Sequence, residues 1–186
     1  EALEDIDNII EKFDGGMVAR GDLGVEIPSA KVPLAQKKIT KLASASGKPV
    51  IIATQMLDSM INNQTPTRAE VSDIANSVFD GVDALMVTGE TAIGQYPIEV
   101  IKTLKNVIRL TEESVSQERI FAPEEINKTS DAISHAVCQI TLDLGIKAIM
   151  SMTHSGSTAK MISKYRPHSN VFALTPFNHI ARQLRL

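Results

Sequence analysis

The chain has 186 residues, of which 43% are hydrophobic and 22% are charged, a balance typical of globular domains and not of disordered tails. Its formal net charge of -3 indicates no general attraction to nucleic acid or to membrane surfaces. A single cysteine excludes an intramolecular disulfide framework and a cysteine-rich metal site, and Cys138 is predicted to be a small core side chain. No apolar run approaches the roughly 18 residues that span a bilayer, and no signal peptide is visible.

Three segments in the first part of the chain share one layout: a short apolar strand, a turn with Gly or Thr, and an amphipathic helix. The strands are predicted at Gly16–Arg20, Val50–Thr54 and Ala84–Thr88. Their starts lie about 34 residues apart, which is the period of a βα unit. Repeated βα units with continuous apolar strands predict a parallel sheet, either a (β/α)8 barrel or an open doubly wound sheet.

The helices of this part have clear start signals. Pro33 suits the first turn of a helix predicted over Leu34–Ser46. Thr67-Arg68-Ala69-Glu70 is a capping-box pattern that opens a helix ending at Phe79. A longer helix is predicted from Pro97 to Glu118.

A different series follows a predicted linker at Phe121–Lys128. It consists of helix Ser130–Leu144, strand Ala148–Met152, turn His154–Ser157, helix Thr158–Tyr165, strand Val171–Leu174 and a helix from Asn178. We therefore expect two domains, residues 1–119 and 120–186. Because the first residue is not Met and the last helix has no stop signal, the chain is expected to be a piece of a longer one.

Candidate site residues follow the three strands of the first part, because sites in such folds lie at the carboxyl ends of strands. Asp22 is a candidate ligand of Mg²⁺ or Mn²⁺, and Gly21 allows its neighbouring N–H groups to approach an anionic substrate. Thr54 and Thr88 add hydroxyls that can bind a substrate or relay a proton. The three turns concerned are Arg20-Gly21-Asp22, Thr54-Gln55-Met56 and Thr88-Gly89-Glu90-Thr91.

Each of these groups also has a purely structural explanation. A Gly-Asp turn is typical of a helix cap or tight turn, and the Thr54 hydroxyl can bond to backbone. Glu26 and Glu90 can be solvated loop charges. Glu90 can equally be a second metal carboxylate, or hold a neighbouring loop through an Arg. The residues alone predict a barrel-like, metal-assisted enzyme acting on an anionic substrate.

The second part contains "MTHSGSTAK", residues 152–160, where hydroxyls gather at the start of a helix. This pattern suits either a phosphate site or a plain N-cap cluster. His154 is interpreted as a solvent-facing loop residue. His135, on an apolar helix, is predicted to be a packing residue.

Four stretches in order, "GGMVARGDLGVEIP", "GKPVIIATQMLDSM", "PTRAEVSDIANSVFDGVDALMVTGETAIGQYP" and "SKYRP", resemble bacterial-type pyruvate kinases. The resemblance covers essentially the whole chain. It implies the last three βα units of a (β/α)8 TIM barrel, followed by a truncated α/β C-terminal domain with a mainly parallel sheet. It also implies glycolytic phosphoryl transfer from phosphoenolpyruvate to ADP, giving pyruvate and ATP, with Mg²⁺ and K⁺.

The resemblance also implies roles for individual residues. Asp22 is a Mg²⁺ ligand, the Gly21 and Asp22 N–H groups hold the substrate carboxylate, and Thr54 lies beside the enolate carbon that is protonated. Thr88 stands where the family often has Ser, so a relay role is retained. Arg20 and Arg68 are placed near a subunit interface. Ile93 replaces a Lys of some members, which weakens any inference about nucleotide contacts.

For the whole enzyme the resemblance implies a cytoplasmic homotetramer with an allosteric effector. The effector is fructose 1,6-bisphosphate, another sugar phosphate or AMP, and its phosphate is held by the loop Thr153, His154, Ser155, Gly156, Ser157 and Thr158. The catalytic Lys, a second metal-binding Glu, a lid domain and most K⁺ ligands belong before residue 1 in the family. The 186 residues alone are therefore expected to be inactive.

Two other interpretations compete with this one. The chain can be a non-catalytic effector-binding or interaction module derived from the same fold. It can also be a different metal-dependent barrel, such as an aldolase acting on a 2-oxo acid, although such enzymes are not expected to combine "PTRAE" and "TGET" with a phosphate-loop domain.

Overall fold

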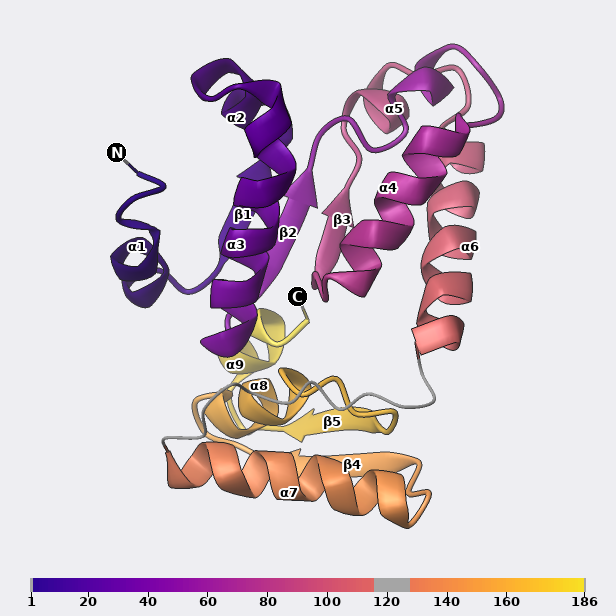
Figure 1. Cartoon of the computed structure of the whole chain (residues 1–186). Helices are drawn as coiled ribbons and strands as arrows, with labels where there is room; N and C mark the ends of the chain where they lie inside the picture. The colour runs from indigo at the N-terminus through magenta and orange to yellow at the C-terminus, as the bar shows by residue number, and fades with distance from the viewer. Residues whose placement is uncertain (1, 116–127, 186) are drawn as a thin grey trace. The chain divides into compact units, whose positions relative to one another are not determined.

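The computed structural model describes residues 2–115 and 128–185 (Figure 1). The chain forms two compact units, Glu1–Gln117 and Glu118–Leu186. The predicted linker Phe121–Lys128 lies outside the described residues except for Lys128, as does the predicted end of a helix at Glu118. Among the described residues, no helix combines the length and the apolar character needed to cross a bilayer.

The first unit is built on a parallel sheet of three strands in the order β1-β2-β3: Gly16–Ala19, Val50–Ala53 and Ala84–Met86. Each strand pairs with the next one along the chain. The predicted α/β class and the three strands are confirmed, although the strands end one or two residues earlier than predicted. They end early because the polar residues after them enter turns and short helices.

Helices connect the strands, as the period of the sequence predicted. α3 (Val32–Ala45) lies between β1 and β2 and α4 (Arg68–Phe79) lies between β2 and β3, while α1 (Ile6–Lys12) precedes β1 and α6 (Pro97–Val115) follows β3. Pro33 lies in the first turn of α3. The capping box at the start of α4 is present in full, with the Thr67 side chain accepting from the Glu70 N–H and the Glu70 side chain accepting from the Thr67 N–H. Gly47 and Gly81, with φ of 66° and 81°, follow the ends of α3 and α4.

The core of the first unit lies between the sheet and these helices. Its buried members come from β1, β2, the turn after β2, α3, α4 and α6, and include Val18, Ala43, Ile52, Met56, Ile74 and Val100. β2 is the central strand and its Val50, Ile52 and Ala53 are fully buried. This accounts for its continuous apolar sequence.

Two short helices occupy positions where the sequence predicted only turns. α2 (Arg20–Glu26) begins directly after β1, and α5 (Gly89–Ala92) follows β3. Single 3-10 turns, η1 (Ser29–Lys31) and η2 (Asp58–Ile61), precede α3 and α4. Helices of one or two turns bury too little surface to show an apolar period, and the glycines at 21 and 24 conceal α2 further.

The second unit contains α7 (Thr129–Asp143), β4 (Ala148–Met152), α8 (Ser157–Ser163), β5 (Asn170–Leu174) and α9 (Asn178–Gln183). β4 and β5 form a parallel pair, as predicted. Residues alternate along β4, with Ile149 and Ser151 buried and Met150 and Met152 exposed. Cys138 is buried in the core cluster of this unit, which confirms its predicted packing role.

Candidate functional site

The carboxyl ends of the parallel strands carry the predicted site residues: Arg20, Gly21 and Asp22 after β1, Thr54 after β2, and Thr88 after β3. Because Ala19 pairs with Ala53 in the sheet, the first two of these turns lie side by side. The Gly21 N–H donates a hydrogen bond to Thr54 Oγ1 at 2.9 Å. The fold thus joins two residues that lie 33 positions apart in sequence.

Asp22 lies in the first turn of α2 and its side chain is exposed. Within the part of the chain that the structure describes, its carboxylate has no ion-pair or hydrogen-bond partner. No group of three or more His, Cys, Asp or Glu side chains suited to a metal occurs among the described residues. An exposed single carboxylate fits Mg²⁺, which proteins usually hold through one or two carboxylates while it keeps several waters.

The turn after β2 has an unusual backbone. Thr54 and Gln55 both have positive φ, 70° and 56°, although neither is glycine. Such a conformation costs of order 1–3 kcal/mol at each residue and persists only where surrounding groups hold it. This strain therefore coincides with a residue that the sequence analysis placed at the site.

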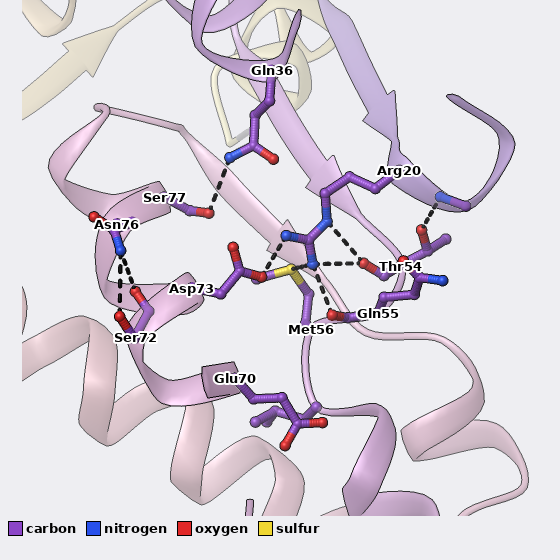
Figure 2. Close-up of polar contacts among 12 residues, drawn as sticks. Arg20, Gln36, Thr54, Gln55, Met56, Glu70, Ser72, Asp73, Asn76 and Ser77 are labelled. Carbon is purple, nitrogen blue, oxygen red and sulfur yellow. Dashed lines mark hydrogen bonds and ion pairs between the residues drawn. The ribbon is translucent and has the colours of Figure 1, made fainter. Parts of the chain in front are cut away.

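Arg20 supplies much of what holds this turn (Figure 2). Its Nη2 donates to the carbonyl oxygens of Thr54 at 2.9 Å and Gln55 at 2.8 Å, and its Nε donates to the Thr54 oxygen at 3.2 Å. Nη2 also lies 3.0 Å from Sδ of Met56. Nη1 forms an ion pair with the Asp73 carboxylate on α4.

These partners all lie within the first unit. The Arg20 side chain is 10% exposed and that of Asp73 is 37% exposed. Both residues line a pocket of about 730 Å³ between α2, α3 and α4. The subunit-interface role expected for Arg20 remains a prediction, and the structure adds an intrachain role that the sequence analysis missed.

Glu90 connects the turns after β2 and β3. It is only 2% exposed, so the interpretation of a solvated loop charge is wrong for this residue. Its Oε1 accepts from the Leu57 N–H at 3.1 Å and its Oε2 from the Thr88 N–H at 2.9 Å. The expectation that it holds a neighbouring loop is confirmed, but backbone N–H groups replace the expected Arg.

The start of α4 is fixed by a carboxylate with four donors. Glu70 accepts from the N–H and hydroxyl of Ser59 at 2.8 and 2.6 Å, and from the N–H and hydroxyl of Thr67 at 2.7 and 2.8 Å. Burial alone would raise the pKa of Glu70, but these hydrogen bonds outweigh it and hold the pKa below its ordinary value. Arg68, the first residue of α4, is exposed, and its interface role remains a prediction.

Some of the polar groups in the hydroxyl-rich loop of the second unit, residues 153–158, form hydrogen bonds within the loop. Thr153 and Gly156 are buried, and the Gly156 N–H donates to Thr153 Oγ1 at 2.9 Å. Gly156 has φ of 84°, a conformation that favours glycine. The hydroxyls of Ser155 and Ser157 lie 3.0 Å apart. The residues left exposed are His154, Ser155, Ser157 and Thr158.

Two histidines of this unit contact aromatic rings. His154 packs edge-on against Phe177 with ring centroids 5.3 Å apart, and its exposure agrees with the predicted loop position. His135 is half-buried and lies 5.1 Å from the Tyr165 ring, which confirms its packing role.

A buried polar cluster in the second unit was not predicted. Asp131 on α7 accepts from the Tyr165 hydroxyl at 2.5 Å and pairs with Lys164 Nζ at 2.7 Å. Burial would raise the pKa of Asp131, but Lys164 and Tyr165 outweigh it and lower the pKa. Burial, together with the Asp131 carboxylate, raises the pKa of Tyr165. Burial also raises the pKa of the neighbouring Cys138 thiol to about 11, so this thiol is not activated.

We expect the second unit to lose stability in acid through Asp131. Its folded-state pKa lies below the ordinary value of 3.8, so the stabilisation is complete above that value and is lost as the pH falls through the folded-state pKa. Amide hydrogen exchange of Ile162, measured from about pH 5 to 2 after correction for intrinsic rates, should report the loss. Asp131→Asn should flatten this dependence, whereas Asp143→Asn, at the exposed end of the same helix, should not. An equal acid response in both variants would contradict the assignment.

The fold and the strand-end groups define an α/β protein whose exposed carboxylate and backbone N–H groups suit a metal and an anionic substrate. Residues 1–101 match the family described as "Pyruvate kinase, barrel domain", and residues 131–186 match "Pyruvate kinase, alpha/beta domain". The chain belongs to the pyruvate kinase family. This confirms both the resemblance and the predicted combination of a barrel segment with an α/β segment.

Individual relatives agree. The pyruvate kinase of Clostridium acetobutylicum is 51% identical over 189 residues, covering 100% of this chain and 40% of the relative. That of Bacillus licheniformis is 49% identical, covering 100% of this chain and 32% of the relative. The crystal structure of a pyruvate kinase from Cryptosporidium parvum matches with a TM-score of 0.92 at 38% identity, covering 99% of this chain and 38% of that one. The chain thus spans well under half the length of these relatives.

Proposed function

We propose that this chain contributes part of the active site of a pyruvate kinase, which transfers the phosphoryl group of phosphoenolpyruvate to ADP and yields pyruvate and ATP in glycolysis. The observation that carries the proposal is the hydrogen bond between the Gly21 N–H and Thr54 Oγ1, beside the exposed carboxylate of Asp22. This hydrogen bond places the Gly21 N–H, the Thr54 hydroxyl and the neighbouring Asp22 at one edge of the sheet, and the family resemblance implies a role for each of them. The 51% identity to a pyruvate kinase over the full chain supports it.

In this proposal Asp22 holds Mg²⁺ or Mn²⁺, and most ligands of K⁺ come from elsewhere in the enzyme. When bound, the divalent ion neutralises charge on the transferring phosphoryl group. The N–H groups of Gly21 and Asp22 bind the substrate carboxylate. That carboxylate competes with Thr54 Oγ1 for the Gly21 N–H and so releases the hydroxyl to act beside the enolate carbon. Thr88, held through its own N–H by Glu90, adds a second hydroxyl for proton relay.

We further propose that the whole enzyme is a cytoplasmic homotetramer, with Arg20 and Arg68 near a subunit interface. A sugar phosphate or AMP would act as effector at the loop Thr153–Thr158. The support is the set of exposed hydroxyls at residues 155, 157 and 158, which are donors suited to phosphate oxygens.

A coupled pyruvate-formation assay tests the activity. The 186-residue chain alone should give no turnover with phosphoenolpyruvate, ADP, Mg²⁺ and K⁺, because the family's catalytic Lys and second metal-binding Glu are not among its residues. A chimera in which this chain replaces the matching segment of the Clostridium acetobutylicum relative should be active. A folded but inactive chimera would favour the non-catalytic module, and turnover by the chain alone would contradict the account of the missing groups.

A further inference from the structure

Thr54 is held at both ends by two consecutive residues of the neighbouring turn. The backbone N–H of Gly21 reaches its side-chain hydroxyl at 2.9 Å, and the guanidinium of Arg20 reaches its main-chain carbonyl. Figure 2 shows the Arg20 side chain directed at the carbonyls of Thr54 and Gln55 on one side and at Asp73 on the other. Without substrate, Gly21 restrains the hydroxyl itself, whereas Arg20 restrains the backbone that carries it, and only the Arg20 contacts persist when a substrate carboxylate takes the Gly21 N–H.

The Asp73 carboxylate determines how the guanidinium is presented. It binds Nη1, which leaves Nη2 and Nε pointing at the two carbonyl oxygens. A planar fork can satisfy a carboxylate and two carbonyls at once, whereas an ammonium group acts as a single compact charge. Asp73 belongs to α4, whose first turn is fixed separately by the capping box of Thr67 and Glu70. The Arg20 guanidinium is thus held by a residue of a helix whose start is itself fixed by hydrogen bonds.

The backbone conformation at Thr54 requires contacts that hold it in place. Two successive non-glycine residues with positive φ would relax if the groups holding their carbonyls were removed. We propose that Arg20 and Asp73 form a positioning pair, which fixes the Thr54 hydroxyl for the reaction by restraining the strained turn Thr54–Gln55. This inference rests on the proposed function for its kinetic consequence, and on geometry alone for its structural one.

The structural consequence is measured on the 186-residue chain itself. Asp73→Asn should accelerate exchange of the Gly21 amide by about tenfold and shift the Thr54 methyl resonance, because the turn is freed. Arg20→Lys should do the same, since Lys keeps the charge but not the fork. Lys37→Met is the matched control: Lys37 pairs with Asp80, the residue directly after α4, and lines the same pocket, but has no hydrogen bond or ion pair to the turn among those that the structure shows.

The kinetic consequence is measured in the chimera. Asp73→Asn and Arg20→Lys should lower kcat by about 10- to 100-fold, the effect of a misplaced catalytic group. KM for phosphoenolpyruvate should change by about twofold or less, since the carboxylate-binding N–H groups remain. The Lys37→Met chimera should keep its kcat.

The exchange measurement and the kinetic measurement distinguish failure of the proposed function from failure of the positioning pair. An inactive chimera before any of these substitutions would overturn the proposed function, while Gly21 exchange would still decide whether Arg20 and Asp73 hold the turn. An active chimera with unchanged Gly21 exchange in Asp73→Asn, or full activity in Arg20→Lys, would overturn the positioning pair. Equal effects of Lys37→Met and Asp73→Asn would also overturn it, because general loosening of α4 would then be the cause.

Discussion

Asp22→Asn in the chimera should lower turnover by about a thousandfold at low Mg²⁺, the scale expected when a metal's charge is no longer placed at the reacting phosphoryl group. The amide keeps the size of the side chain and removes its charge. Asp22 is exposed and has no partner within the described residues, so the free energy of unfolding should hardly change. The measurement is the coupled assay over a Mg²⁺ titration, with thermal unfolding followed in parallel.

Glu26→Gln provides the control for this substitution. Glu26 is also exposed on α2, one turn beyond Asp22, but lies farther from the strand end. It should retain both turnover and its Mg²⁺ requirement. Normal activity of Asp22→Asn at low Mg²⁺ would show that the metal is held elsewhere, and a similar loss in Glu26→Gln would point to the charge of the whole helix.

Glu90→Gln should lower the free energy of unfolding of the first unit by about 3 kcal/mol, because an amide cannot accept from both backbone donors. Its NH₂ group would face the N–H of either Leu57 or Thr88, and one buried donor would lose its acceptor. Urea unfolding followed by circular dichroism measures this difference. In the chimera, turnover should fall as well, since the same carboxylate fixes the Thr88 turn.

Two further variants sharpen this test. Glu112→Gln, at an exposed position on α6, should leave the midpoint of unfolding where it is. Gly94→Ala should be at least as harmful as Glu90→Gln, because its Cβ would lie 2.2 Å from the Glu90 carbonyl oxygen. If Glu90→Gln unfolds at the same urea concentration as Glu112→Gln, the bridging role of Glu90 is wrong.

The sequence predicted features that depend on local signals. The βα period located β1, β2 and β3, and the pattern Thr67–Glu70 located the start of α4. These predictions are correct because strand burial and helix capping depend on residues that are close together in the sequence.

Features that depend on distant partners were missed. Arg20 and Asp73 lie 53 positions apart, and nothing near either residue indicates the other. Glu90 looked like a loop charge because its two donors are backbone groups, which any sequence supplies. The Asp131, Lys164 and Tyr165 cluster likewise joins α7 to the end of α8. Only the folded arrangement determines which charged groups become buried and paired.

The strand order β1-β2-β3 has a consequence for how the first unit forms during synthesis. β2 and β3 each pair with the strand that directly precedes them in the chain, so the partner of each has already been synthesised when it forms. Such sequential pairing keeps the loops to be closed short and favours rapid assembly. During synthesis from the N-terminus, β2 and β3 can therefore each add to a strand that has already left the ribosome.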